Sequence, residues 1–206
     1  MTDGLQGLRD DVAFMRGLAE QGRNAPLLGG SVLVAAGAVF APASLAHWAV
    51  VSDRWDLPRS GLAVIWVAAV AVFLVALFTS KSRMRGQADA SSRNNQASGA
   101  VWTGVGLASF ALWGAFMIAS VRTGEFVIMD MFAVIILALY GAGFSVAGAL
   151  SGQAWLKAVA GAAMLLAVGL ALLVGRPEQY LLYALALVLV ALVPGLVMIR
   201  QARTAT

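Results

Sequence analysis

Six long apolar stretches occupy most of this chain of 206 residues, and each is about long enough to cross a lipid bilayer. A transmembrane helix needs roughly 20 apolar residues to span about 30 Å of hydrocarbon. Hydrophobic residues make up 61% of the sequence, charged residues make up 12%, and the mean hydropathy is +0.85, which excludes an ordinary soluble domain. The predicted spans are Leu27–Val50, Gly61–Thr79, Gly99–Val121, Phe126–Leu150, Trp155–Gly175 and Tyr180–Ile199.

The stretches are continuously apolar rather than alternating, which favours helices over barrel strands, because lipid offers no hydrogen-bond partner to an open backbone. The sequence therefore predicts an all-α, polytopic membrane protein. The connections are short, except for a polar segment at 81–98 that we expect to be a flexible loop. Short links make sequential helices antiparallel neighbours, so we expect three hairpins in one bundle. This bundle covers residues 26–200, after an N-terminal segment of residues 1–25 and before a tail of residues 201–206.

The basic residues predict the orientation, because cytoplasmic loops carry an excess of Lys and Arg. With the N-terminus in the cytoplasm, ten of the 14 basic residues fall on the cytoplasmic side and four on the other. The ten are Arg9, Arg16, Arg23, Lys81, Arg83, Arg85, Arg93, Lys157, Arg200 and Arg203, and the four are Arg54, Arg59, Arg122 and Arg176. We expect both termini to be cytoplasmic.

Composition excludes several kinds of chemistry. The chain has no cysteine and a single histidine, His47, so disulfides, thiolate metal sites and multi-histidine metal or haem sites are excluded within one chain. A catalytic set needs several titratable groups at one depth, so we expect no enzyme, no metal and no cofactor. The net charge is +4, but the basic residues lie between apolar spans, so we expect anionic lipid headgroups rather than nucleic acid as partners.

The N-terminal segment has helical periodicity from about Asp3 to Gln21, with one apolar side. Arginines spaced by seven line its edge, which is typical of an interfacial helix packed on lipid. The same spacing resembles a short heptad seam that docks a partner or a second copy of the chain. The candidate contacts for lipid or a partner, in this segment and in the long loop, are Arg9, Arg16, Arg23, Lys81, Arg83 and Arg85.

Two resemblances begin in the same region. The residues from Asp11-Val12-Ala13-Phe14-Met15 through Ala25-Pro26-Leu27-Leu28-Gly29-Gly30 resemble the opening of small uncharacterised six-span membrane proteins of bacteria, over about a tenth of the chain. This resemblance implies a bacterial inner membrane. Asn24-Ala25-Pro26-Leu27 is similar to the Asn-Pro-Ala-Pro-Leu-Gly motif of the acetate-uptake transporter family, but it lacks the first proline and spaces the glycine differently. No acetate-binding residue is therefore transferred to this chain.

Ionisable side chains inside lipid are the strongest pointers to function, because each costs several kcal/mol unless it is solvated or paired. Asp130 lies about one turn inside the fourth predicted span, and His47 lies about one turn from the end of the first. One hypothesis joins them in an outer vestibule that responds to protons or cations, since histidine changes charge near neutral pH. The alternative pairs Asp130 with an arginine and leaves His47 as a boundary residue. The candidate outer cluster comprises Asp130, His47, Arg122, Glu125, Arg176 and Glu178.

Two classes of function remain. The first is a non-catalytic accessory, regulatory or assembly component that contacts partners or itself in the membrane, and an interior of Ala, Gly, Leu and Val favours it. The second is a small oligomeric channel or facilitator for a neutral or weakly acidic solute. Pro42 and Pro194 are its candidate hinges, because each removes a backbone hydrogen bond inside an apolar helix. We favour the first class, because no predicted span carries a charge at the membrane centre, where carriers and pumps normally hold one.

Small residues recur at four-residue spacing, as in the pairs Gly37/Ala41, Gly104/Ala108, Gly141/Ser145 and Gly148/Gly152. Such faces let helices approach closely in a membrane. They predict tight packing between helices.

Overall fold

A computed structural model of the chain describes residue 12, residues 29–84 and residues 93–204. The first five spans are the helices α2 (Gly30–Val51), α3 (Gly61–Met84), α4 (Arg93–Thr123), α5 (Val127–Ser151) and α6 (Ala154–Ala171). The last span consists of α7 (Glu178–Leu187), a π-helical segment η2 (Val188–Leu192) and α8 (Val193–Thr204). Within the described ranges, six helical segments are long and apolar enough to cross a membrane, which confirms the predicted multi-span, all-helical class.

The helix bounds differ from the prediction most at α4. This helix begins at Arg93, whereas the polar residues up to Ser98 were expected in a loop, and that expectation was wrong. Extending an existing helix adds one hydrogen bond per residue without a new nucleation step, so a polar stretch adjoining an apolar helix readily continues it. The predicted N-terminal helix lies outside the described residues, apart from residue 12.

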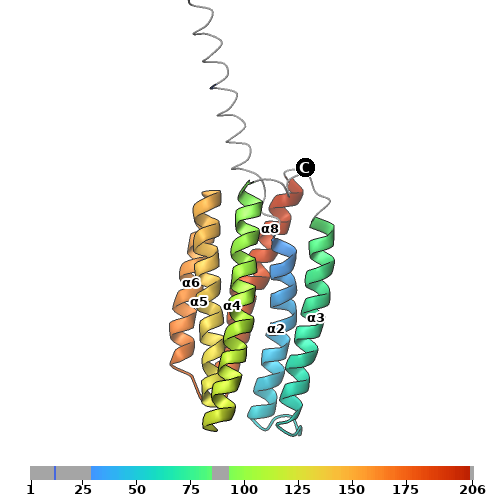
Figure 1. Cartoon of the computed structure of the whole chain (residues 1–206), viewed down its shortest axis with the longest axis vertical. Helices are drawn as coiled ribbons and strands as arrows, with labels where there is room; N and C mark the ends of the chain where they lie inside the picture. The colour runs from blue at the N-terminus through green and yellow to red at the C-terminus, as the bar shows by residue number, and fades with distance from the viewer. Residues whose placement is uncertain (1–11, 13–28, 85–92, 205–206) are drawn as a thin grey trace, which may run out of the picture.

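The helices form two groups of three. In one group α2 lies between α3 and the last span, and in the other α5 lies between α4 and α6 (Figure 1). The most extensive packing joins α5 to α6 and α2 to the last span. α6 touches the last span over a small area only, although the link between them is short. The last span therefore has α2, the first helix of the bundle, as its main neighbour.

Glycines make the close packing of α2 on the last span possible. A Cβ atom at Gly195 would lie 2.7 Å from the backbone oxygen of Gly30 and 2.7 Å from the backbone nitrogen of Val34. A Cβ atom at Gly37 would lie 2.7 Å from the backbone nitrogen of Leu192. Real Cβ contacts are not this short, so only glycine fits at these crossings, as in other membrane helix pairs with small interface residues.

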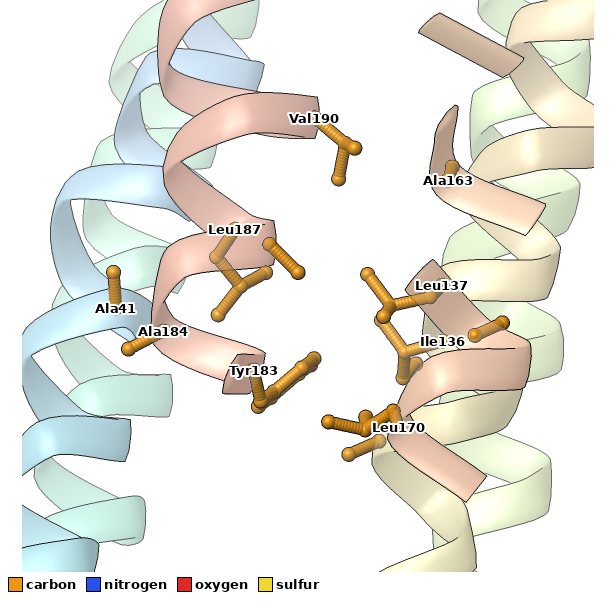
Figure 2. Close-up of a cluster of buried hydrophobic side chains, with 12 residues drawn as sticks. Ala41, Ile136, Leu137, Ala163, Leu170, Tyr183, Ala184, Leu187 and Val190 are labelled. Carbon is orange, nitrogen blue, oxygen red and sulfur yellow. The ribbon is translucent and has the colours of Figure 1, made fainter. Parts of the chain in front are cut away.

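An apolar core cluster fills the seam between the two groups. Tyr183, Leu187 and Val190 of the last span face Leu137 of α5 and Leu170 of α6 across the seam (Figure 2). The remaining buried members are Ala41, Ala133, Ile136, Ala163, Ala167, Ala184 and Ala186. Apart from one tyrosine hydroxyl, this cluster carries no polar side-chain group.

The two prolines lie in different surroundings. α2 continues through Pro42, whose side chain is exposed. Pro194 is buried and lies two residues after the end of the π-helical segment. A π-helical turn holds one extra residue, and such turns are found where the regular hydrogen-bond ladder is interrupted, as a proline interrupts it here.

Candidate functional site

Five side chains from four helices gather at the end of the bundle opposite Thr204, which we call the distal end. They come from the last turns of α2, the second turn of α3 and the first turns of α5 and α7. We call this group the distal cluster, and its members are His47, Trp66, Asp130, Gln179 and Tyr180. The cluster brings together Asp130 and His47, the pair singled out in the sequence, through Tyr180, which contacts both.

Asp130 is held by two consecutive residues of α7. The Tyr180 hydroxyl donates a hydrogen bond to Oδ1 of Asp130 at 2.5 Å, and Nε2 of Gln179 donates to the backbone oxygen of Asp130 at 2.6 Å. On the other side, the Ser44 hydroxyl of α2 donates to the backbone oxygen of Tyr180 at 2.9 Å. These bonds join the two three-helix groups at the distal end, because α5 belongs to one group and α2 and α7 belong to the other.

His47 lies between two aromatic rings. Nε1 of Trp66 donates a hydrogen bond to Nδ1 of His47 at 2.9 Å, and the imidazole stacks on the Tyr180 ring with centroids 3.6 Å apart and planes at 17°. An indole nitrogen is only a donor, so Nδ1 must carry a lone pair. The bond therefore requires an imidazole that is neutral, with its proton on Nε2.

This tautomer gives a direct prediction for nuclear magnetic resonance. With ¹⁵N-labelled histidine in a lipid nanodisc at neutral pH, His47 should show a proton on Nε2 and none on Nδ1. Trp66→Phe removes the donor and should let the other tautomer or the cation appear. An Nδ1-protonated ring in the unsubstituted protein would contradict the hydrogen bond. Because His47 is the single histidine, its signals need no further assignment.

The side-chain oxygen of Gln179 is a buried hydrogen-bond acceptor to which no described residue donates. Its side chain is fully buried, and its Oε1 atom has no hydrogen-bond partner among the described residues. Turning the amide over would not help, because Nε2 donates to a carbonyl oxygen and the turned group would place oxygen against oxygen. An unsatisfied buried acceptor costs roughly 1–3 kcal/mol. The hydroxyl of Ser120, near the end of α4, is also buried without a partner in the described part of the chain.

Among the described residues, the four other charged members of the candidate outer cluster form no hydrogen bond or ion pair with the Asp130 side chain. Arg122, Glu125, Arg176 and Glu178 are all exposed. Within the described ranges, the hydrogen-bond partner of the Asp130 carboxylate is Tyr180, and no ion pair joins it to either arginine. The alternative expected from the sequence, in which an arginine neutralises Asp130, is therefore not the arrangement that the structure shows.

Sequence reasoning did not single out the partners of the pair. Tyr180 was named only as the first residue of the last predicted span, and Trp66, Gln179 and Ser44 were not proposed as site residues. The available signal was the pair Gln179-Tyr180 at the start of an apolar span, where two polar side chains enter the bundle together.

The remaining candidate residues do not join this site. Lys81 is exposed near the end of α3, which is the opposite end of the bundle. Arg9, Arg16, Arg23 and Arg85 lie outside the described residues, as does the side chain of Arg83. In the described part of the chain, no three His, Cys, Asp or Glu side chains are grouped so that they could hold a metal ion.

A scan against protein-family models and searches of the curated proteins and of the solved structures found no match.

Proposed function

We propose that this chain is a non-catalytic component of a bacterial inner membrane. Both of its termini lie in the cytoplasm, and its distal end lies on the opposite side of the membrane. Its role is accessory, regulatory or structural, and it acts through contacts in the membrane with another membrane protein or with a second copy of itself. Anionic lipid headgroups are the partners of its basic loops. One observation carries this proposal: the seam between the two three-helix groups is filled with apolar side chains rather than with reactive or charged ones.

The outer helices support a role in contacts. α3 and α4 each pack mainly on one neighbour, and large apolar side chains on both face away from the bundle. Val67 of α3 is 69% exposed and Leu107 of α4 is 68% exposed. Lipid or another protein covers such faces, because apolar area of this extent is not left in water.

A second function, a facilitator for a small neutral or weakly acidic solute, is favoured by two tyrosines at the seam. Tyr183 is buried in the core cluster and Tyr140 packs against it. Neither hydroxyl has a hydrogen-bond partner within the described ranges, although buried tyrosines usually find one. A tyrosine hydroxyl without a partner in the described part of the chain can donate a hydrogen bond to a solute that carries an acceptor.

Solute flux separates the two functions. Purified protein in liposomes should show no saturable uptake of weak acids, small neutral solutes or protons above that of empty liposomes. Circular dichroism of the same liposomes provides the control for folding. Saturable uptake that is reduced by Tyr183→Phe, with the helix content unchanged, would overturn the accessory role and establish the facilitator.

Contacts in the membrane form the second arm of this test. A photoreactive amino acid at position 67 or 107 should give adducts of discrete protein mass in native membranes, and the same probe at the buried position 137 should not. Adducts with lipid alone at both exposed positions would contradict a protein partner on these two faces.

A further inference from the structure

We propose that the distal cluster binds a small monovalent cation, ammonium or an alkali metal ion, between the carboxylate of Asp130 and the buried amide oxygen of Gln179. This inference goes beyond the proposed function and does not depend on it. It combines a charge without a counterion and a buried acceptor without a donor, both among the residues that the structure describes.

The charge belongs to Asp130. Its side chain is partly buried at the start of α5, where the helix dipole favours a carboxylate. One oxygen accepts the Tyr180 hydroxyl, and within the described residues no arginine, lysine or histidine forms an ion pair with either oxygen. A negative group that is partly withdrawn from water and has no counterion attracts a cation.

The acceptor belongs to Gln179. Its Nε2 atom donates to the backbone oxygen of Asp130, so the side-chain amide group of Gln179 lies next to that residue. Oε1 is fully buried and has no donor in the described part of the chain. A carboxylate oxygen and an amide oxygen are ligands that hard cations use, and they are equally the acceptors that an ammonium ion needs.

The surroundings favour a single positive charge. The cluster contains one carboxylate, whereas sites for divalent ions in proteins use more charged oxygen ligands. His47 is neutral in this geometry, so it does not repel a cation. The nearest charged residues in sequence are Glu178 of α7, Glu125 of the loop before α5 and Arg122 of the last turn of α4, and all three are exposed. Arg176, before α7, is exposed as well.

The test is the thermal unfolding of the full chain in nanodiscs, titrated with ammonium, sodium or potassium chloride. N-methylglucamine chloride keeps the ionic strength constant and supplies a cation that is too large for the site. At least one of the three small cations should raise the unfolding temperature in a saturable way, because a ligand that binds only the folded state stabilises it. Ammonium alone would identify a site that recognises N–H donors, and sodium or potassium would identify a site of oxygen ligands.

Matched variants show whether the rise in unfolding temperature comes from cation binding at this site. Asp130→Asn keeps an acceptor for Tyr180 but removes the charge, and it should abolish the saturable shift. Glu178→Gln removes a neighbouring exposed carboxylate and should leave the shift unchanged. Gln179→Met removes the buried acceptor and should weaken the apparent affinity at least tenfold, which provides a second reading if Asp130→Asn does not fold. The proposal is overturned if no small cation gives a saturable shift in the unsubstituted chain, or if Asp130→Asn or Gln179→Met responds as the unsubstituted chain does. Flux in liposomes is a separate measurement, so the failure of either proposal leaves the other intact.

Discussion

Gly195→Ala should lower the free energy of unfolding by about 1–3 kcal/mol, the usual cost of inserting a carbon into a well-packed site. The added Cβ would lie 2.7 Å from two backbone atoms of α2, the oxygen of Gly30 and the nitrogen of Val34. Backbone atoms do not rotate out of the way as a side chain does, so α2 and α8 must move apart. The packing of the last span on its main neighbour is weakened as a result.

Unfolding by sodium dodecyl sulfate in mixed micelles measures this loss. Gly161→Ala is the matched control, because it also adds one carbon to a glycine in a spanning helix, but a Cβ there meets no atom within 4 Å. We expect the control to unfold at nearly the same detergent fraction as the unsubstituted protein. Equal stability of the two variants would show that α2 and α8 do not approach as closely as described.

Tyr180→Phe should lower the free energy of unfolding by about 1.5–3 kcal/mol, the range for a hydrogen bond to a charged group. The substitution keeps the ring that stacks on His47 and removes the hydroxyl that donates to Asp130. The carboxylate then loses its hydrogen-bond donor within the described residues, and one of the bonds that join α7 to α5 is lost.

Tyr140→Phe is the control for this second prediction. It makes the same chemical change in a tyrosine whose hydroxyl has no hydrogen bond in the described part of the chain. The same detergent titration should show a clear loss for Tyr180→Phe and little change for Tyr140→Phe. Equal losses would mean that the bond to Asp130 contributes nothing to stability.

Part of the candidate site could be predicted from the sequence. Asp130 and His47 stood out because each is a polar group near the end of an apolar span, and the cost of placing such groups in lipid is a local property. The bridge between them could not be predicted. Tyr180 contacts an aspartate 50 residues away, and Ser44 contacts the backbone of Tyr180 at a separation of 136 residues. Contacts between residues so far apart along the chain produce no periodic pattern in the sequence from which they could be predicted.

The small-residue pairs show the same limit. The sequence marked Gly37, Gly104 and Gly141 alike, as members of faces that permit close packing. In the structure, Gly37 lies against Leu192 and Gly141 lies against Met164, whereas a Cβ at Gly104 meets nothing within 4 Å. Spacing identifies a face that allows an approach, but the position of the neighbouring helix decides whether the approach occurs.

The class of the fold, apolar helices with strongly polar groups near the helix ends, can be predicted from the sequence alone. These properties follow from the transfer of each segment into lipid, which depends on that segment's own residues and length. The neighbours of each helix and the partner of Asp130 are seen only in the folded chain. There the last span packs on the first helix of the bundle, two groups of three helices meet at an apolar seam, and Asp130 accepts a hydrogen bond from Tyr180 rather than pairing with an arginine. Lipid is as apolar as the helices, so the choice of neighbours depends on the detailed fit of side chains and on a few hydrogen bonds, which exist only once distant segments are in contact.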